Sequence, residues 1–489
     1  MKTADHVIGP TGRVLVTNQT FKTMNKRNSG NVINRRDFIR TSAVGLTTLS
    51  AGRVFGANDR INVGLIGFGL IGRFHLAALK AQPDVQVTAV CDVHKGRVEQ
   101  AAEMAGGNPA RYGDFRKLLE DKNVDAVWVA TPDHWHALMA MIACAAGKDV
   151  YVEKPTTLFV REGRWMLDVA RRTKRVIQVG TQNRSGPPFQ RARELIRQGK
   201  LGTIVSVSIN NSRNVSPGFG NPPDQSPPPD LDYDLFLGPA PKRPYNPNRS
   251  IYHFRWFWDY SGGQATNLGQ HSLDLVHWML GVKAPKSVYS AGGRWFLKDN
   301  CEVPDTQDVI MEYPGFTVTC QYREATAGHG GLGMGGLTFY GTQGCLPISR
   351  SSFELSPDPK INPNNLVAGI LGVKGHPVGG PQLQPEEKGQ FWTTPEKDES
   401  GDAIKDYARH ARNFLDCVKS RQQPLSDLES GHQIATACHL SNISLRLGGR
   451  KLVWDADHEE VVGDKEANAM LVRPYRTPWD KELKALRVG

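Results

Sequence analysis

The chain has 489 residues, 39% hydrophobic and 22% charged, which is enough for two domains and ordinary for a globular protein. No stretch holds the roughly 18 uncharged apolar residues that a membrane span requires, and the seven cysteines are scattered without metal-ligand spacing. The net charge of +11 does not indicate nucleic-acid binding, because residues 1–57, with nine Lys or Arg and two Asp, carry +7 of it and no basic stripe follows.

Residues 1–57 are predicted to be a leader. Residues 34–40 resemble the twin-arginine export signal, an apolar stretch follows at 43–51, and Gly56-Ala57 offers small residues for cleavage. Met24 is a plausible start, since it leaves a short basic segment before the arginine pair. The alternative is a basic tail without a signal. The export signal predicts a periplasmic protein.

A buried strand over residues 60–66 is followed by a glycine-rich loop and a helix over residues 73–80, the order of a dinucleotide-binding fingerprint. The first glycine permits the tight turn and the second lets the backbone approach a pyrophosphate. The third lets the helix pack on the strand with its N–H groups toward the phosphates. The cofactor-binding residues predicted in the loop are Gly67, Phe68, Gly69, Leu70, Ile71 and Gly72.

A second strand, over residues 85–91, ends in Asp92, twenty residues after Gly72. A carboxylate there can accept hydrogen bonds from the adenosine ribose and would repel a 2′-phosphate, so the sequence favours NAD over NADP. The basic residues that keep NADP possible are His94, Lys95 and Arg97.

Three further strands are predicted to end in polar residues at the same edge of this sheet. Residues 124–130 lead into Thr131-Pro132 and His136, residues 149–152 into Glu153-Lys154-Pro155, and residues 175–180 into Thr181-Gln182-Asn183. Loops at the carboxyl ends of parallel strands form the ligand crevice, so Lys154 would stand beside a nicotinamide ring. As alternatives, His136 could cap its helix and Lys154 could be a surface charge.

Beyond residue 183 the pattern changes. The sequence predicts a helix over 188–198, a strand over 203–209 and a Pro-, Asn- and Asp-rich loop over 214–250. A block of aromatic and charged residues follows at 252–260. Such a block suits a sugar, and we expect Arg255 and Trp258 to contact it; a hydrophobic cluster under the loop is the alternative. The sequence then predicts strands over residues 286–296, 308–322 and 337–340. A surface insertion is expected over 357–400, followed by helices over 403–420 and 428–447.

Residues 261–278 are predicted to form a helix opened by glycines, with Asn267 and His271 four apart on one face. Asp274 and His277 extend that face. A metal site of His271, Asp274 and His277 is therefore an alternative to a histidine that Asp274 orients.

Residues 60–455 resemble the glucose–fructose oxidoreductase/inositol dehydrogenase/MocA (Gfo/Idh/MocA) family of nicotinamide-dependent sugar oxidoreductases. The resemblance rests on four motifs in this order: the glycine loop, Thr131-Pro132 with His136, Glu153-Lys154-Pro155, and the block around His271. The resemblance implies an α/β Rossmann domain plus an α+β domain with an open, mostly antiparallel sheet that often mediates oligomerisation. It also implies that Lys154 and His271 are catalytic and that no metal is needed.

The domains predicted on this basis are the leader 1–57, an NAD(P)-binding Rossmann domain over 58–182, a substrate and oligomerisation domain over 183–455, whose closing helices pack back on the first, and an unassigned tail over 456–489. Outside the glycine loop, the expected cofactor contacts are Asp92, Thr131, Pro132, His136, Glu153, Lys154 and Gln182. The expected substrate contacts are Asn183, Arg255, Trp258, Asn267 and His271.

Asn267 departs from the family pattern, since many relatives have an aspartate four residues before the histidine. An amide can donate and accept hydrogen bonds but supplies no charge. His271 should then be a weaker base, or proton transfer should depend more on Lys154.

The leading hypothesis is hydride transfer between a sugar or polyol and NAD(H), with Lys154 or His271 taking the hydroxyl proton. Export would separate the enzyme from the cytoplasmic cofactor pool, so the cofactor should travel bound and be recycled in place. A redox-neutral glycosidase or lyase cycle of oxidation, elimination, hydration and reduction is the alternative. A sugar-binding protein with purely structural NAD is a third, which the pairing of Lys154 with His271 disfavours.

Overall fold

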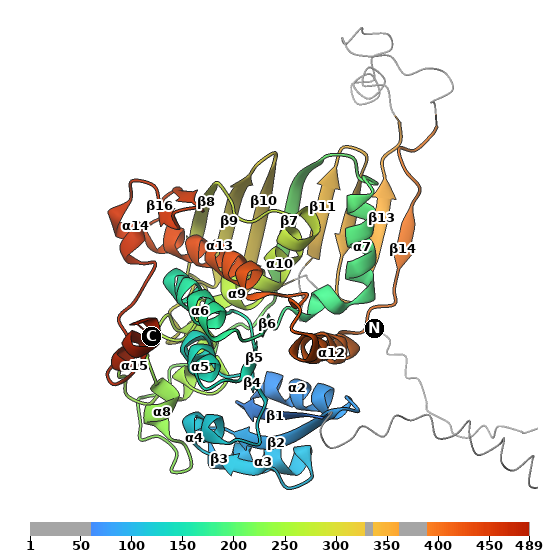
Figure 1. Ribbon diagram of the computed structural model, residues 1–489. Coiled ribbons are helices and arrows are strands. Elements are labelled where there is room, and N and C mark those ends of the chain that lie inside the picture. Colours follow the sequence, from blue (N-terminus) through green and yellow to red (C-terminus); the bar gives the residue numbers. More distant parts are fainter. Residues whose placement is uncertain (1–59, 328–335, 361–388, 489) are drawn as a thin grey trace, which may run out of the picture. The chain divides into compact units, whose positions relative to one another are not determined.

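The computed structural model describes residues 60–327, 336–360 and 389–488, so the predicted leader and its twin-arginine segment lie outside the described residues. The first domain is a six-stranded parallel sheet in the order β3-β2-β1-β4-β5-β6 (Figure 1). Its strands are β1 (Ile61–Ile66), β2 (Val85–Cys91), β3 (Ala110–Tyr112), β4 (Ala126–Val129), β5 (Asp149–Val152) and β6 (Ile177–Val179). This order reverses beside β1, and in such sheets ligands bind outside the carboxyl ends of the strands at that point.

The helices between these strands are α2 (Leu70–Lys80), α3 (Lys95–Ala105), α4 (Phe115–Glu120), α5 (Asp133–Ala145) and α6 (Val160–Thr173). The strands β4 and β5 are buried along their whole length, which explains their continuous apolar sequence. On one side of the sheet, Trp128 and Tyr151 stack and pack with Phe414. Phe414 belongs to α12 (Ala403–Ser420), which packs on α2.

The second sheet has ten strands in the order β14-β13-β12-β11-β7-β10-β9-β8-β15-β16. They are β7 (Ile204–Ser212), β8 (Ser287–Gly293), β9 (Thr306–Tyr313), β10 (Phe316–Arg323), β11 (Gly336–Gly341), β12 (Gly344–Ile348), β13 (Phe353–Pro357), β14 (Glu396–Asp398), β15 (Leu452–Asp455) and β16 (Glu460–Val461). Every pair is antiparallel except β7 with β10. The predicted fold class, a Rossmann domain plus an open, mostly antiparallel sheet, is confirmed.

Helices cover one face of the second sheet (Figure 1). They are α7 (Pro187–Arg197), α10 (Gly269–Leu280) and α13 (Leu428–Arg446). α13 also packs against α6 of the first domain. The remaining helices are η2 (Gln182–Ser185), α8 (Tyr233–Leu237), η3 (Pro247–Arg249), η4 (His253–Trp256), α9 (Gly263–Asn267), α14 (Lys465–Ala469) and α15 (Trp479–Val488).

The structure corrects four expectations about elements. The single strand expected over residues 308–322 is two antiparallel strands, because β9 ends at Tyr313 and β10 begins at Phe316. The single helix expected over residues 261–278 is two helices, because α9 ends at Asn267 and α10 begins at Gly269. The expected surface insertion at 357–400 returns as β14, which pairs with β13; its residues 361–388 lie outside the described part. The unassigned tail forms α14 and α15, and Trp479 of α15 packs edge-on against Trp135 of α5.

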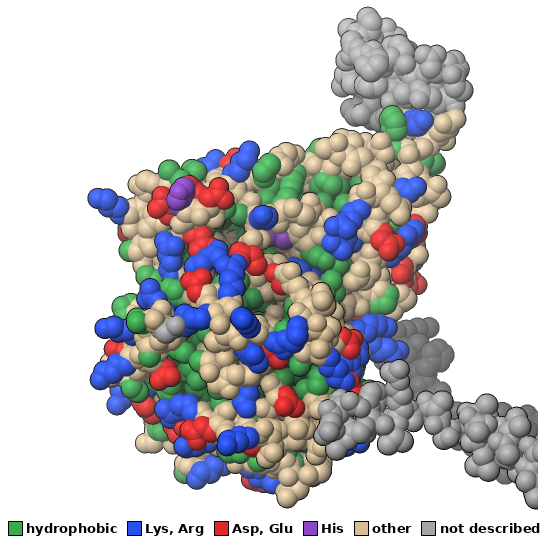
Figure 2. All heavy atoms as spheres, in the orientation of Figure 1, with side chains coloured by type: hydrophobic (Ala, Val, Ile, Leu, Met, Phe, Trp, Pro, Cys, Tyr) green, Lys and Arg blue, Asp and Glu red, His purple; other side chains and the backbone are tan. Residues whose placement is uncertain are grey.

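On the face seen in Figure 2, basic and acidic side chains are interspersed rather than gathered into a stripe of one sign. Ion pairs between described residues include Arg171 with Glu429 and Arg421 with Asp149. Among the described helices, none has the length and apolar character needed to cross a bilayer.

Candidate active site

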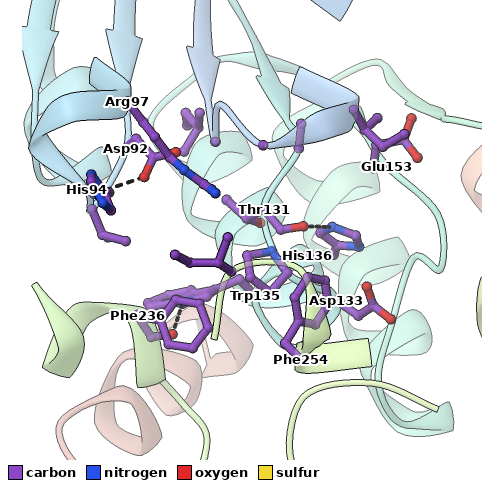
Figure 3. A pocket seen from close by; sticks show the side chains of 18 of the residues that line it. Asp92, His94, Arg97, Thr131, Asp133, Trp135, His136, Glu153, Phe236 and Phe254 are labelled. Carbon is purple, nitrogen blue, oxygen red and sulfur yellow. Dashed lines mark hydrogen bonds between the residues drawn. The ribbon is translucent and has the colours of Figure 1, made fainter. Parts of the chain in front are cut away.

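A cavity of about 360 Å³ opens at the carboxyl ends of β1, β2, β4 and β5 (Figure 3). This volume is within the usual range for small-molecule sites. The residues predicted from sequence that line it are Gly67, Gly69, Leu70, Ile71, Asp92, Thr131, Pro132, His136, Glu153, Lys154, Arg255 and Asn267. The predicted residues that do not line it are Phe68, Gly72, Gln182, Asn183, Trp258 and His271.

The glycine loop has the geometry of a phosphate cradle. Gly67 has a φ of +93°, and a Cβ there would lie 2.6 Å from the Ala130 carbonyl oxygen. A Cβ on Gly72 would lie 2.2 Å from the Gly67 carbonyl oxygen, so the loop can close on α2 only without side chains at these two positions. Gly69, by contrast, faces open space: its nearest neighbour would be Arg97 Nη1 at 3.9 Å.

The amino terminus of α2 has no side-chain cap and no acidic residue in its first turn. Gly69, Leu70 and Ile71 line the cavity, so no capping side chain competes with a ligand at this helix end. An uncapped helix end under a glycine loop favours an anion such as a pyrophosphate.

Asp92 lies at the end of β2 beside this loop (Figure 3). One carboxylate oxygen accepts a hydrogen bond from the Phe68 N–H at 2.8 Å, and the other accepts one from the His94 N–H at 2.9 Å. Arg97 lines the cavity as well, with its Nη1 nearest to the open space at Gly69. The carboxylate and the guanidinium thus lie at the same end of the cavity.

Lys154 lies at the opposite end of the cavity, where the two domains meet. Its ammonium donates to the backbone oxygen of Asn267 at 2.7 Å and to the Asn267 Oδ1 at 3.3 Å. Burial lowers the pKa of Lys154 to about 8, the charges of Glu153 and Asp133 oppose this shift, and those of Arg255 and Arg350 reinforce it. A lysine with such a pKa exchanges protons near neutral pH.

Asn267 is therefore a partner of Lys154 rather than of His271. Its amide donates to Gln264 Oε1 at 3.2 Å, and the Gln264 amide donates to Glu324 Oε1 at 2.5 Å. This chain of hydrogen bonds directs Asn267 Oδ1 toward the ammonium. The Asn267 side chain was expected to lie beside His271. It does not, because the helix breaks between the two residues.

His271 lines a second, smaller cavity of about 40 Å³ together with Asn183 and Arg350. Asn267 faces the first cavity and the next residue, Leu268, faces the second, so the two cavities adjoin. The pKa of His271 is well below its usual value because the ring is buried and because Lys154 and Arg350 add positive charge nearby. His271 is thus a neutral imidazole at physiological pH.

Glu153 fixes the strand end that carries Lys154. Its Oε1 shares a hydrogen bond of 2.7 Å with the Nε2 of buried His75, and its Oε2 accepts from the Lys154 N–H at 3.1 Å. Burial acts to raise the pKa of Glu153, but the His75 hydrogen bond and the nearby positive charge bring it below the usual value. Sequence reasoning missed His75, although its place three residues after Gly72 puts it on the α2 face toward β5.

His136 is held between two carbonyl groups. Its Nδ1 is 2.6 Å from the Pro155 oxygen and its Nε2 is 2.8 Å from the Thr131 oxygen (Figure 3). The ring joins the ends of β4 and β5 and lines the cavity without a nitrogen free for a substrate.

The residues of the alternative metal site are engaged elsewhere. Both carboxylate oxygens of Asp274 accept from the buried Arg184 guanidinium, and His277 Nε2 lies 2.7 Å from the Tyr313 hydroxyl. Asp274 therefore neither orients His271 nor shares a ligand set with it. Among the described residues no group of three His, Cys, Asp or Glu has metal-binding geometry.

The aromatic block divides between the cavity and the core. Arg255 lines the first cavity, where it stacks on Tyr252 and Phe254 and donates to the Tyr252 carbonyl at 2.9 Å. Trp258 lies outside both cavities, with the Arg446 guanidinium over its ring. Gln182 is buried in η2 and also lines neither.

Comparison with known proteins gives three family models that match parts of the chain, the second and third of which overlap. Residues 61–181 match the oxidoreductase family, NAD-binding Rossmann fold; residues 186–291 and 388–481 match the oxidoreductase family, C-terminal alpha/beta domain; and residues 241–346 match the GFO/IDH/MocA C-terminal domain.

Curated relatives match parts of the chain. The inositol 2-dehydrogenase/D-chiro-inositol 3-dehydrogenase of Lactiplantibacillus plantarum is 32% identical over 157 residues, 32% of this chain and 45% of the relative. A glycosyl hydrolase family 109 protein of Saccharopolyspora erythraea is 35% identical over 175 residues, 30% of this chain and 38% of the relative. The match thus spans less than half of the length of each relative.

Among solved structures, levoglucosan dehydrogenase in complex with NADH and levoglucosan superposes with a TM-score of 0.60 over 80% of this chain and 99% of that one, at 18% identity. At this identity the likeness concerns the fold.

Proposed function

Because the chain belongs to the Gfo/Idh/MocA family of oxidoreductases and has its NAD-binding Rossmann domain, we propose that it oxidises an alcohol group of a sugar or polyol in the cavity between its two domains. The observation that carries the proposal is Lys154, whose pKa of about 8 suits a base at neutral pH and which lies at the cavity end away from Asp92. The dehydrogenases among its relatives act on inositol and levoglucosan.

The residues present fit NAD. The uncapped α2 terminus and the open space at Gly69 would hold the pyrophosphate, and Asp92 the adenosine ribose. When bound, the nicotinamide accepts or returns a hydride. The chain's own task is to move the hydroxyl proton.

In the oxidising direction, neutral Lys154 accepts the proton of the substrate hydroxyl. Asn267 holds the resulting ammonium through its backbone oxygen and Oδ1. His271 is neutral and its Nδ1 has no partner in the described structure, so it can hydrogen-bond the same hydroxyl from the second cavity. Lys154 is the base and His271 positions the substrate.

Replacing Asp92 by serine is expected to change the cofactor preference. Serine removes the charge that would repel a 2′-phosphate, while Arg97 remains to attract it. We expect the ratio of the NADP to the NAD dissociation constant to fall about tenfold or more, equivalent to at least about 1.4 kcal/mol. Fluorescence titration of both reduced cofactors measures it. Asp168→Ser, an exposed change on α6, should leave the ratio unchanged; an unchanged ratio in Asp92→Ser contradicts the role of Asp92.

We also propose that the protein is exported with its cofactor bound, on the basis of the arginine pair at 35–36. Turnover would then depend on recycling in place, either by a second sugar that reoxidises the cofactor or by a redox-neutral cleavage cycle. The match to a glycosyl hydrolase family 109 protein favours keeping the second route as an alternative.

One preparation tests these proposals. The exported protein is purified, its absorbance is recorded for bound nicotinamide, and free sugars and aryl glycosides are added without external NAD. Accumulation of NADH that only a second sugar clears supports the oxidoreductase. Aglycone release without net NADH supports the cleavage cycle, and a protein that carries no cofactor and exchanges added NAD freely contradicts retention.

The uncovered face of the second sheet is proposed to form a homo-oligomer. Tyr289 of β8 and Ile310 of β9 are paired across the sheet and are 41% and 47% exposed, and Tyr340 of β11 is 41% exposed. Exposed apolar side chains on a sheet face that no helix covers are typical of interfaces. We expect Ile310→Arg to dissociate the assembly to a monomer in analytical ultracentrifugation, while Ile404→Arg, an exposed change on α12, leaves it intact. A wild-type monomer contradicts the proposal.

A further inference from the structure

The second cavity is lined by hydrogen-bond donors that have no acceptor. Arg350, in the turn between β12 and β13, makes no ion pair and no side-chain hydrogen bond among the described residues. The Asn211 amide nitrogen, on a side chain only 4% exposed, also has no partner. A buried donor without an acceptor costs free energy, so a site that keeps two of them in one cavity fits a ligand that supplies the acceptors.

The carboxylates nearest Arg350 are already in use. Asp406 and Glu153 act on its guanidinium only at longer range. Asp406 pairs with Arg409 at 2.7 Å, and Glu153 bonds to His75 at 2.7 Å. Burial lowers the pKa of Arg350, yet an arginine remains charged at neutral pH. Among the described residues, Arg350 therefore has no carboxylate in direct contact.

The first cavity repeats this feature on the other side of Lys154. Within the described part of the chain Arg255 also lacks an ion pair. The carboxylate with the largest electrostatic effect on it, Asp133, accepts a hydrogen bond from the Ser261 hydroxyl. Two guanidinium groups that act on Lys154, Arg255 in the first cavity and Arg350 in the second, thus both lack an ion pair with a described residue. This surplus of positive charge favours a substrate that brings a negative one.

We propose that the second cavity binds a carboxylate carried by the sugar, with Arg350 and Asn211 as donors, while the hydroxyl to be oxidised lies between Lys154 and His271. The cavity of about 40 Å³ is small and leaves room for a small anionic group such as a carboxylate. The planar guanidinium matches a carboxylate with two parallel hydrogen bonds. The preferred substrates would then be sugar acids, an inference that rests on the proposed oxidoreductase function.

Calorimetric titration of the NADH-loaded protein tests this at constant ionic strength. The probes are acetate, inorganic phosphate, D-glucuronate and D-glucose, compared in wild type, Arg350→Met and Arg350→Lys. Acetate serves because its binding does not depend on the configuration of a sugar. We expect wild type to bind acetate more tightly than phosphate, and Arg350→Met to bind acetate and glucuronate about 10–100-fold more weakly, the range for losing a charge-assisted pair. Arg350→Lys should be intermediate.

Arg197→Met removes an equal charge from the exposed end of α7 and should behave as wild type. Three results overturn the inference: no binding of acetate or glucuronate to wild type, equal binding by wild type and Arg350→Met, or tighter binding of phosphate than of acetate. NADH binding and oxidation of neutral polyols are measured in the same preparations. If these persist while Arg350→Met changes no affinity, only this inference fails; if wild type binds no NADH, the proposed function itself fails.

Discussion

Replacing Lys154 by methionine is expected to lower kcat for sugar oxidation about 10²–10⁴-fold, the usual contribution of a general base. Methionine has a similar length and no titratable group, so it fills the position without accepting the hydroxyl proton. NADH should still bind, because the glycine loop and Asp92 lie at the other end of the cavity. Steady-state kinetics and fluorescence titration of NADH measure the two effects separately.

The control for this variant is Lys122→Met, an exposed change in the same domain that should leave both values as in wild type. Thermal unfolding checks the fold, since Lys154→Met leaves the Asn267 oxygens without their donor. Lys154→Ala provides a second test, because a small primary amine such as ethylamine should restore part of the turnover if the lysine acts as a base. More than a tenth of wild-type kcat in Lys154→Met, with no rescue of Lys154→Ala, contradicts the assigned role.

The cofactor half of the site could be predicted from sequence because its determinants are local. The turn at Gly67, the open approach at Gly69 and the contact between Gly72 and the loop involve residues within one strand, one loop and one helix. Parallel strands also end at one edge of the sheet, so the relative positions of Asp92 and Lys154 followed from the element order alone.

The substrate half could not be predicted in the same way, because distant segments form it. Arg350 belongs to a turn almost 200 residues after Lys154, and no local pattern marks it as part of a cavity. The break at Leu268 was not predicted either, because it depends on a distant strand. There, Gly269 lacks the Cβ that would collide with the Tyr322 hydroxyl, so α10 can begin close against β10.

That break determines which residue Asn267 forms hydrogen bonds with. Spacing of four within one helix would have placed its side chain beside His271. With α9 ending at Asn267, the backbone oxygen of that residue is free of the helix and accepts from Lys154 together with Oδ1. A neutral amide thus contacts the ammonium where an aspartate would form an ion pair, which helps to explain why burial can lower the pKa of Lys154 to about 8.

Asn267→Asp should reverse this effect. A carboxylate in place of Oδ1, 3.3 Å from the ammonium, favours the charged lysine and should raise its pKa by about 1–3 units. Oxidation requires the neutral amine, whose population rises with pH through the pKa. The rising limb of kcat/KM, centred near pH 8 in wild type, should therefore move to higher pH, and activity at pH 7 should fall about 10–1000-fold and recover in alkaline solution.

The matched comparison is Asn267→Ala, which removes the same side-chain hydrogen bond without adding charge and leaves the backbone oxygen in place. Its limb should not move to higher pH, although its maximum rate can fall. Thermal unfolding of Asn267→Asp is needed as well, because its second carboxylate oxygen would face Gln264 Oε1. If the limbs of Asn267→Asp and wild type coincide in pH, the group that titrates is not Lys154, and the next residue to test as the base is His271.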